Sequence, residues 1–541
     1  MPVTLYSCSL QGLSGVLTEV EVDILSGIPA FTIVGLTDTS IQEAKERIIS
    51  AIKNSGFEFP RMKKTINLAP ADTRKHGPLF DLPIALGLLL ASGQIPFRDD
   101  FRESIFAGEL ALDGSLRRIH GALLLADFAK KHGYKRIFLP EANALEASLV
   151  SEIDIYPLQS LRTFENFFSG RTLIQPLRTS ELDFEKWASR HDRGASNHKE
   201  NSFDMSQIQG LTHAKRALEI AAAGSHNVLF TGPPGSGKTL LARSFSTILP
   251  KLNLQEALEV TKMYSLMGRL DPSKPLITTP PFRSVHHKAS AFSILGGGAF
   301  PRPGEISLAH KGVLFLDEIA EFSLSVLETL RQPLEDHSIT IGRASATITY
   351  PAHFTLIAAM NPCPCGYLHD AHHSCACSSS QVLNYQKKLS GPFLDRMDIF
   401  LDIPRTKVEI LASDSGGEIS KSIRERVQKA RDIQTRRFQT HHSRADYCAE
   451  NNDRGTQNLP DENLINHSIT SNSEMSLPLL RKHCKLDISS QNILKQALNT
   501  FHLSNRSYYR ILKVARTIAD LQGEENISEA NVAEALQYRK R

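Results

Sequence analysis

The residues from 232 to 239 have the composition and spacing of a phosphate-binding loop. They are Gly232, Pro233, Pro234, Gly235, Ser236, Gly237, Lys238 and Thr239. An apolar run ends at Phe230 and a helical stretch begins at Leu240, which supplies the strand, turn and helix that a P-loop requires. Backbone N–H groups would surround a β-phosphate, Lys238 would contact the β- and γ-phosphates, and the Thr239 hydroxyl would face Mg²⁺. The segment predicts nucleotide binding, whereas an ordinary glycine-rich turn would explain neither flank.

Two acidic residues follow a second apolar run. Val313 to Leu316 leads directly into Asp317 and Glu318. A strand beside the P-loop strand would bring Asp317 to the Mg²⁺ shell and Glu318 to an attacking water. Taken alone, the pattern also fits a core strand that ends in surface acids. Together with the P-loop, it predicts an ATP hydrolase.

Two polar residues further along the chain are candidates for the same site. Asn361 ends an apolar run that begins at Phe354, and its amide is suited to orienting a water near the γ-phosphate. Arg396 precedes another apolar segment, and it would stabilise transition-state charge if it reached the γ-phosphate of a neighbouring subunit. Its spacing fits an ion pair with Asp395 or Asp398 equally well. The residues alone leave both roles of Arg396 open.

A basic stretch near the C-terminus carries Arg506 and Arg510. Its pattern predicts a helix from which one arginine closes over the nucleotide. Basic helix faces are more often simply solvated, and this alternative stays open.

Four cysteines lie within fifteen residues: Cys363, Cys365, Cys375 and Cys377. They form two C-x-C pairs separated by nine residues, and four thiolates can close a tetrahedral structural Zn²⁺ site. The spacing differs from the commoner C-x₂-C, so free buried cysteines or a redox-sensitive pair are the alternatives. A four-cysteine shell leaves no open coordination position, so we expect no catalysis at this metal.

The overall composition is that of an ordinary globular protein. The chain has 541 residues, 41% hydrophobic and 22% charged, and a formal net charge of +4. This weak positive charge permits a nucleic-acid partner without arguing for one, because a local basic track matters more. The apolar run near residues 82–91 is too short to cross a bilayer and predicts a buried helix, and no signal peptide is apparent. With seven cysteines crowded mainly into one cluster, the chain is predicted to be cytoplasmic and without a membrane partner.

Apolar periodicity divides the chain into several predicted units. Expected strands at 16–22, 30–34 and 64–68 alternate with expected helices at 41–54 and 82–92, which predicts an α/β or α+β domain at the N-terminus. The predicted units are residues 1–175, a polar linker over 176–203, a P-loop domain over 204–404 and a helical domain over 405–541. A polar stretch at about 441–475 inside the last unit is expected to be a surface insertion.

The order of these motifs resembles an AAA+ ATPase. The glycine-rich segment from Gly296 to His310 resembles the magnesium chelatase-like branch, and residues 35–38, 81–86 and 361–366 narrow the likeness to the ComM/YifB family. The likeness covers nearly the whole chain, apart from the linker and the insertion. It implies an N-terminal Lon-protease-like (S5-type) α+β domain, an AAA+ P-loop α/β core and a C-terminal helical lid. It also implies a homo-hexameric ring with ATP and Mg²⁺ bound between subunits.

The same resemblance implies a role for each candidate residue. Lys238 and Thr239 correspond to Walker A, Asp317 and Glu318 to Walker B, Asn361 to sensor 1, Arg396 to an arginine finger acting in trans, and Arg506 to sensor 2. The segment from Met263 to Phe300, which includes His286 and His287, stands where related enzymes carry an insertion in their second helix.

The segment from Ser338 to Thr349 has the pattern of a β-hairpin. Runs rich in β-branched residues flank a centre of small residues, and Arg343 lies near the tip. MCM helicases, in the same branch, carry a hairpin with a basic residue facing the ring pore, and Arg343 is similarly placed. Repeated around a ring, one phosphate contact per subunit would grip a DNA backbone without reading its sequence. A solvent-exposed arginine without a partner is the alternative.

Residues 106–121 are similar to the proteolytic domain of Lon. Lon-type peptidases use a serine nucleophile that a lysine activates. In this chain Leu79 stands at the serine position and Leu123 at the lysine position. We therefore expect a retained fold, serving as a ring-building or DNA-guiding module, without peptidase activity.

Together these features predict an ATP-driven DNA motor. The family likeness implies a helicase that performs branch migration in homologous recombination during natural transformation. Branched, single- or double-stranded DNA is the expected partner, with recombination proteins as further candidates. The alternative is a protein-remodelling ATPase that resembles the magnesium chelatase motor subunit, and it predicts no stimulation by DNA.

Overall fold

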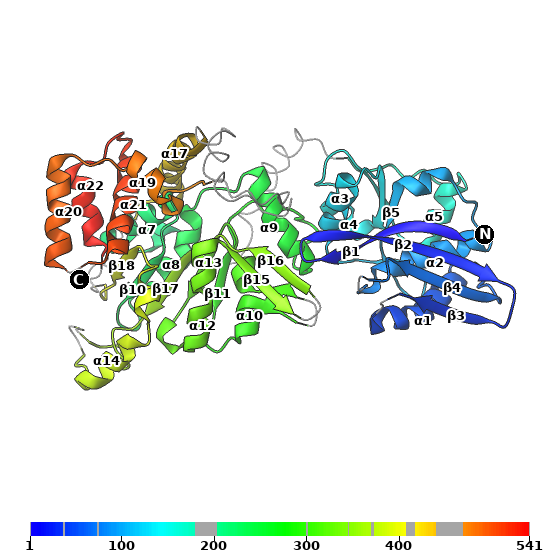
Figure 1. Cartoon of the computed structure of the whole chain (residues 1–541), viewed down its shortest axis with the longest axis horizontal. Helices are drawn as coiled ribbons and strands as arrows, with labels where there is room; N and C mark the ends of the chain where they lie inside the picture. Colours follow the sequence, from blue (N-terminus) through cyan, green and yellow to red (C-terminus); the bar gives the residue numbers. More distant parts are fainter. Residues whose placement is uncertain are drawn as a thin grey trace, which may run out of the picture.

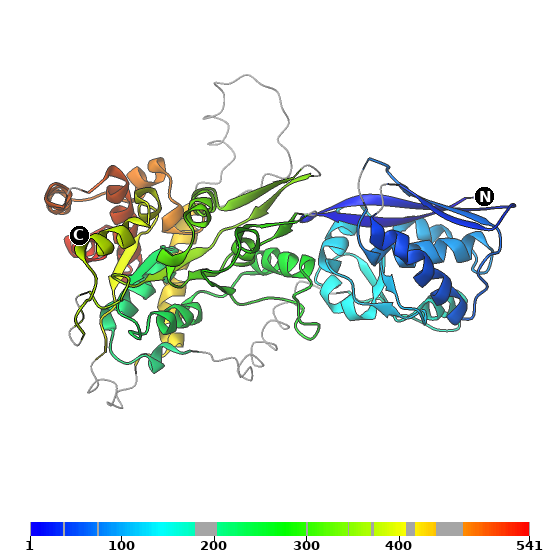
Figure 2. The ribbon, with the colours of Figure 1, turned by 90° about the horizontal axis from the view of Figure 1, so that it is seen from below.

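The computed structural model describes residues 2–178, 203–406, 417–439 and 469–539, apart from 36–37, 73–74, 299–300, 344–345, 369, 371–372 and 502. The molecule is elongated, with an N-terminal α/β unit at one end, a parallel sheet in the middle and C-terminal helices at the other end (Figures 1 and 2). Among the described residues, no helix is both long enough and apolar enough to cross a membrane. The predicted linker lies almost entirely outside the described residues.

A seven-stranded mixed sheet forms the centre of the N-terminal unit, in the order β3-β4-β2-β1-β5-β8-β9. Its strands are β1 (Val3–Gln11), β2 (Ser14–Leu25), β3 (Ala30–Val34), β4 (Lys63–Ala69), β5 (Ser104–Phe106), β8 (Arg136–Pro140) and β9 (Asp154–Leu158). The helices of this unit are α1 (Thr39–Asn54), α2 (Asp81–Ala91), α3 (Ala122–Lys131), α4 (Glu141–Ala147) and α5 (Leu161–Phe168), and a short β6–β7 pair joins Glu109–Leu110 to Leu116–Arg117. Helix α2 is buried along nearly its whole length, which explains its continuous apolar sequence and confirms the predicted core helix.

The two positions that a Lon-type dyad would need are apolar in the structure as well. Leu79 lies in a short 3₁₀ turn before α2, and Leu123 is fully buried on α3. Neither side chain offers a nucleophile or a base.

A five-stranded parallel sheet forms the centre of the molecule, in the order β11-β14-β17-β10-β18. The strands are β10 (Val228–Thr231), β11 (Phe282–Val285), β14 (Val313–Leu316), β17 (Thr355–Met360) and β18 (Ile399–Asp402). The accompanying helices are α7 (Thr212–Gly224), α8 (Lys238–Ile248), α9 (Leu254–Leu266), α10 (Ala291–Leu295), α11 (Glu305–Leu308), α12 (Leu324–Thr329), α13 (Arg331–Asp336), α14 (Ser379–Lys387) and α15 (Gly391–Leu394). Because all neighbouring strands are parallel, their carboxyl ends open at one edge of the sheet.

An antiparallel hairpin interrupts the path between α13 and β17. It consists of β15 (Ser338–Arg343) and β16 (Ala346–Pro351), and Arg343 pairs with Ala346 at the end of the described ladder. Buried Ile339, Ile341 and Tyr350 attach the hairpin to the same apolar core as β14 and β17. The hairpin that the residue pattern predicted is therefore present as a separate two-stranded sheet (Figure 2).

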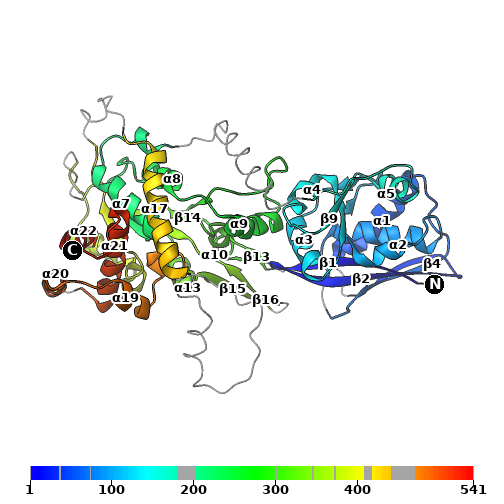
Figure 3. The same ribbon diagram turned by 90° about the horizontal axis from the view of Figure 1, so that it is seen from above.

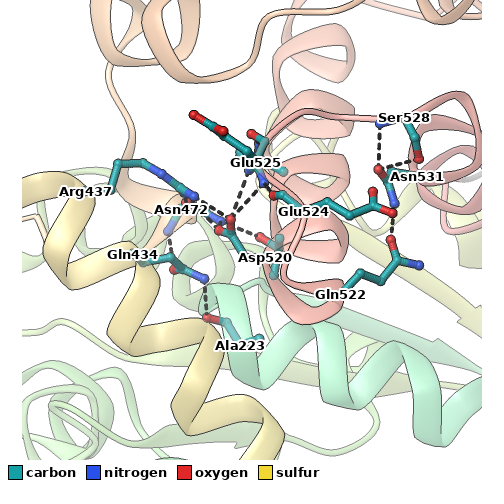
Figure 4. A network of polar contacts seen from close by, with 12 residues as sticks. Ala223, Gln434, Arg437, Asn472, Asp520, Gln522, Glu524, Glu525, Ser528 and Asn531 are labelled. Carbon is teal, nitrogen blue, oxygen red and sulfur yellow. Dashed lines mark hydrogen bonds and ion pairs between the residues drawn. The ribbon is translucent and has the colours of Figure 1, made fainter.

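The C-terminal helices form a lid held by a buried polar network. They are α17 (Ser420–Gln439), α19 (Leu477–His483), α20 (Ile488–Thr500), α21 (Asn505–Gln522) and α22 (Glu529–Gln537). Asp520 of α21 accepts hydrogen bonds from Arg437 of α17 at 2.9 Å and from Asn472 at 2.8 Å (Figure 4). Gln434 donates to the Ala223 carbonyl at 3.1 Å, which joins α17 to α7.

The same network corrects the predicted extent of the polar insertion. We expected a surface segment up to about residue 475, but Ser471 and Asn472 are fully buried and Met475 is 2% exposed. The polar side chains of this stretch are accommodated because they satisfy hydrogen bonds inside the lid. Residues 469–475 thus belong to the lid, and 440–468 lie outside the described residues.

Helices α3 and α4 of the N-terminal unit contact α9 of the central unit, and the turn between β1 and β2 packs against Ile348 of the hairpin. Lys262 of α9 forms an ion pair with Asp127 of α3 at 2.9 Å, and the Gly121 N–H donates to the Ser265 carbonyl at 3.0 Å. The Ser265 hydroxyl also donates to Glu146 of α4. These contacts explain why α9 lies beside α3 and α4 in Figure 3.

Candidate nucleotide site

The P-loop closes around its own lysine at the carboxyl end of β10. The ammonium Nζ of Lys238 donates to the Gly232 carbonyl at 2.6 Å and to the Pro233 carbonyl at 2.9 Å. A Cβ on Gly232 would lie 2.3 Å from the Ile403 carbonyl oxygen, so this position requires glycine. Gly237 has a φ of 90° immediately before α8, a conformation that favours glycine. The loop therefore places the N-terminus of α8 against the site, as phosphate binding requires.

Residues from three strand ends meet at this loop. The Thr239 hydroxyl donates to Asp317 Oδ2 at 2.8 Å, and Lys238 Nζ donates to Asn361 Oδ1 at 3.3 Å. Asp317 follows β14 and Asn361 follows β17. We expected the strand of Asp317 to lie beside the P-loop strand, but β17 lies between β14 and β10, and the parallel register still brings both strand ends to the loop. Burial lowers the pKa of Lys238, and the carboxylates of Asp317 and Glu318 oppose this shift. The predicted cluster of Lys238, Thr239, Asp317 and Asn361 is brought together within one chain.

Glu318 contacts a histidine that lies just after the edge strand β11. Its backbone is left-handed, with a φ of 52°, and its side chain is 53% exposed. Its Oε2 lies 3.2 Å from Nδ1 of His287. Val285 of β11 pairs with Leu316 of β14, so the register carries His287 and Glu318 to the same edge of the sheet. The sequence placed His287 only in the segment that corresponds to a second-helix insertion in related enzymes, and it did not predict this contact. His287 and Glu318 each stand two residues after a paired strand position, and this shared offset could have indicated the contact.

Arg396 is held by partners in its own chain. Its residue is 5% exposed, and Nη2 lies 2.5 Å from Oε1 of Glu335. Nη1 donates to the Pro392 carbonyl at 2.6 Å and Nε donates to the Arg331 carbonyl at 3.3 Å. The ion pair that sequence reasoning left open therefore forms with Glu335 rather than with Asp395 or Asp398. A role of Arg396 at a neighbouring subunit's nucleotide stays a prediction.

Asp398 has other partners, including Arg510 of the lid. Its Oδ2 accepts from the Asn227 N–H at 3.0 Å, and Arg510 donates to Oδ1. Burial opposes ionisation of Asp398, but Arg510 and His226 together hold its pKa below the usual range. Arg510 thus fastens α21 to the end of the sheet. Arg506, one turn earlier on α21, is exposed, and its predicted sensor role stays a prediction.

The four clustered cysteines lie on the loop that follows Asn361. The Sγ atom of Cys363 is 3.4 Å from that of Cys365 and 3.6 Å from that of Cys375. All four sulfurs, including that of Cys377, lie within 4.8 Å of one another. A tetrahedral Zn²⁺ with bonds of about 2.3 Å separates its sulfur ligands by about 3.8 Å. The spacing of the four thiols therefore fits a tetrahedral Zn²⁺ ion.

The cysteine loop also contacts the P-loop. A Cβ on Gly366 would lie 2.6 Å from Cδ of Pro234. Gly366 follows Cys365 directly, so the cysteine cluster lies next to the P-loop.

The fold and site define a class of protein. A P-loop and two polar strand ends on a five-stranded parallel sheet, followed by a helical lid, are the parts of an AAA+ protein. Three family models match the chain: magnesium chelatase, subunit ChlI, over residues 204–411; subunit ChlI of Mg-chelatase over 20–143; and magnesium chelatase, subunit ChlI C-terminal, over 417–539.

Relatives cover nearly the entire chain. Competence protein ComM of Haemophilus influenzae is 41% identical over 535 residues, which are 99% of this chain and 96% of the relative. The protein YifB of Escherichia coli is 40% identical over 521 residues, 96% of this chain and 93% of its own. The magnesium-chelatase 67 kDa subunit of Chlorobaculum parvum is 28% identical over 162 residues, 29% of this chain and 23% of its own. The chain belongs to the ComM/YifB family of magnesium chelatase-like AAA+ proteins, which confirms the resemblance drawn from its motifs.

Proposed function

We propose that this protein hydrolyses ATP with Mg²⁺ at the carboxyl edge of its five-stranded sheet, and that a homo-hexameric ring uses this hydrolysis to move along DNA. The hydrolytic part of the proposal rests on the meeting of Lys238, Thr239, Asp317 and Asn361. Membership of a magnesium chelatase-like AAA+ family supports it.

The side chains of the site divide the work of hydrolysis. The P-loop N–H groups and Lys238 bind the β- and γ-phosphates. Thr239 and Asp317, already 2.8 Å apart, are placed to hold Mg²⁺, which would neutralise charge on the phosphate oxygens. Glu318 accepts the proton of the attacking water and Asn361 orients that water. One oxygen of the Glu318 carboxylate, Oε2, also lies 3.2 Å from Nδ1 of His287.

The DNA part of the proposal rests on the β15–β16 hairpin. β16 continues through a short link into β17, whose end carries Asn361 beside Lys238. The hairpin that bears Arg343 is therefore connected through one strand to the nucleotide site, so a change at the site can be transmitted to the hairpin. The name of the Haemophilus influenzae relative, a competence protein, favours a role in DNA uptake and recombination. We infer branch migration of recombination joints as the output and cytoplasmic DNA as the substrate.

Replacing Arg343 with alanine tests the DNA contact. We expect basal ATPase to stay within about twofold of the wild type, whereas stimulation by DNA is lost, because the change removes a phosphate contact and leaves the nucleotide site intact. ATPase is measured with and without a labelled four-way junction, and junction unwinding is followed on a gel.

The matched control is Arg436→Ala, an exposed arginine on lid helix α17. It should behave as the wild type. If DNA does not change the ATPase rate of the wild type and the junctions stay intact, the motor proposal fails and the protein-remodelling alternative gains support.

Zn²⁺ at the four cysteines is a second part of the proposal. We expect about one Zn²⁺ per chain by metal analysis. The double variant Cys375→Ser/Cys377→Ser should lose the metal and also lose ATPase activity, because the loop packs against Pro234. Cys484→Ala, at a buried cysteine of the lid, should keep the metal. Metal-free wild-type protein with freely titratable thiols would instead support free or redox-active cysteines.

A further inference from the structure

The contacts of Arg396 converge on one short helix. Nη2 pairs with the Glu335 carboxylate at 2.5 Å, and Nε donates to the Arg331 carbonyl at 3.3 Å. Both residues belong to α13. The guanidinium is therefore tied to α13 at a side chain and at the backbone, so a displacement of this helix displaces the guanidinium's partners.

Helix α13 leads directly into the hairpin. It ends at His337, which has a left-handed φ of 52° and donates its N–H to the Pro333 carbonyl at 3.1 Å. Ser338, the next residue, begins β15. The Ala352 N–H, just after β16, donates to the His337 carbonyl at 2.8 Å. Both strands of the hairpin are thus anchored at the end of α13, two residues from Glu335.

Burial and charge single out Glu335 as the group that holds Arg396. The Arg396 side chain is 6% exposed, whereas that of Glu335 is 50% exposed. A buried guanidinium needs a carboxylate or another anion beside it. Asp398 is engaged with Arg510 and the Asn227 N–H, and Glu335 is left as the paired acid. A half-exposed acid can exchange for a competing anion, such as the γ-phosphate of a neighbouring subunit, at little desolvation cost.

We propose that Glu335 is a positioning residue that couples the hairpin of one subunit to the nucleotide site that the same subunit's Arg396 completes on its neighbour. When DNA moves the hairpin, α13 shifts and Glu335 delivers or withdraws Arg396. The inference rests on the proposed function, because it requires both a shared ATP site and DNA at the hairpin. It adds a route by which DNA bound at the hairpin of one subunit changes the rate of ATP hydrolysis at the neighbouring subunit's site.

The test compares Glu335→Ala with Asp336→Ala in the full-length protein. Asp336 is the next acid on α13, is exposed, and forms no ion pair within the part of the chain that the structure describes. Steady-state ATPase is measured against ATP concentration with and without DNA, and ring assembly is followed by light scattering. We expect Glu335→Ala to lower the DNA stimulation of kcat by at least about fivefold while the KM for ATP stays within about twofold. Asp336→Ala should match the wild type.

A further variant separates coupling from simple stability. Glu335→Gln retains an oxygen that accepts from Arg396 and should recover part of the stimulation.

The outcomes distinguish this inference from the proposed function. Wild-type protein without DNA stimulation would remove the proposed function itself. A stimulated wild type together with an equally stimulated Glu335→Ala variant would overturn only the coupling role. A Glu335→Ala loss confined to ring assembly or to ATP affinity would overturn it as well, since the residue would then serve structure alone.

Discussion

Replacing Lys238 with alanine is expected to abolish ATP hydrolysis, with kcat/KM falling on the order of 10³-fold or more. The buried ammonium lies between the P-loop carbonyls and Asn361, and alanine removes its charge from this position. Nucleotide affinity should fall with the rate, because the charge contacts phosphates before as well as during the reaction. Steady-state ATPase and equilibrium binding of a fluorescent ATP analogue measure the two effects.

Glu318→Gln provides the informative comparison at the same site. It should also stop hydrolysis, but it should bind ATP about as tightly as the wild type, because Glu318 acts on the water rather than on the phosphates. Lys251→Ala, at an exposed lysine shortly after α8, serves as the charge control and should leave both quantities unchanged. A Lys238→Ala variant that hydrolyses ATP at the wild-type rate would remove the nucleotide site from this loop.

Replacing Arg396 with alanine is expected to lower kcat by about 10³-fold or more while each subunit still binds ATP. The reason is that Arg396 would stabilise transition-state charge at the neighbouring subunit's site. The altered subunit keeps its own P-loop and therefore its ATP binding. ATPase assays and ATP-analogue binding separate the two effects. Arg396 also packs within its own subunit, so thermal unfolding must show that the variant is folded.

Mixed rings decide whether Arg396 acts in trans. Arg396→Ala subunits keep an intact P-loop and acids, and Glu318→Gln subunits keep an intact Arg396. Mixing the two inactive variants in equal amounts should restore activity at roughly a quarter of the interfaces, where an intact site meets an intact arginine. An inactive mixture that still exchanges subunits would contradict a shared site and leave Arg396 as a structural partner of Glu335.

Contiguous segments were predicted well because their chemistry is local. A strand, a glycine-rich turn and a helix follow one another from 228 to 248, so the P-loop needs only its own sequence to form. Patterns of residue type likewise predicted the hairpin at 338–351 and the core helix at 81–91. The apolar runs before Asp317 and Asn361 also indicated strands, and parallel strands bring their ends to one edge.

The partners of charged side chains could not be predicted in the same way. The choice between Asp395, Asp398 and Glu335 as the partner of Arg396 depends on where α13 lies, which spacing along the chain does not reveal. For the same reason, the polar stretch at 469–475 suggested a surface loop, although Asn472 is buried against Asp520. Polarity predicts exposure only when no other segment supplies hydrogen-bond partners.

The sequence by itself determined that this chain has a P-loop, two acids directly after an apolar strand, a cysteine cluster and the motifs of the ComM/YifB family. Tertiary structure alone decided that Glu318 meets His287, that Glu335 holds Arg396, and that the cysteine loop touches Pro234. The physical reason is that binding motifs are encoded by neighbours in the chain, whereas the direction of a charged side chain is set by whichever distant segment the fold packs against it.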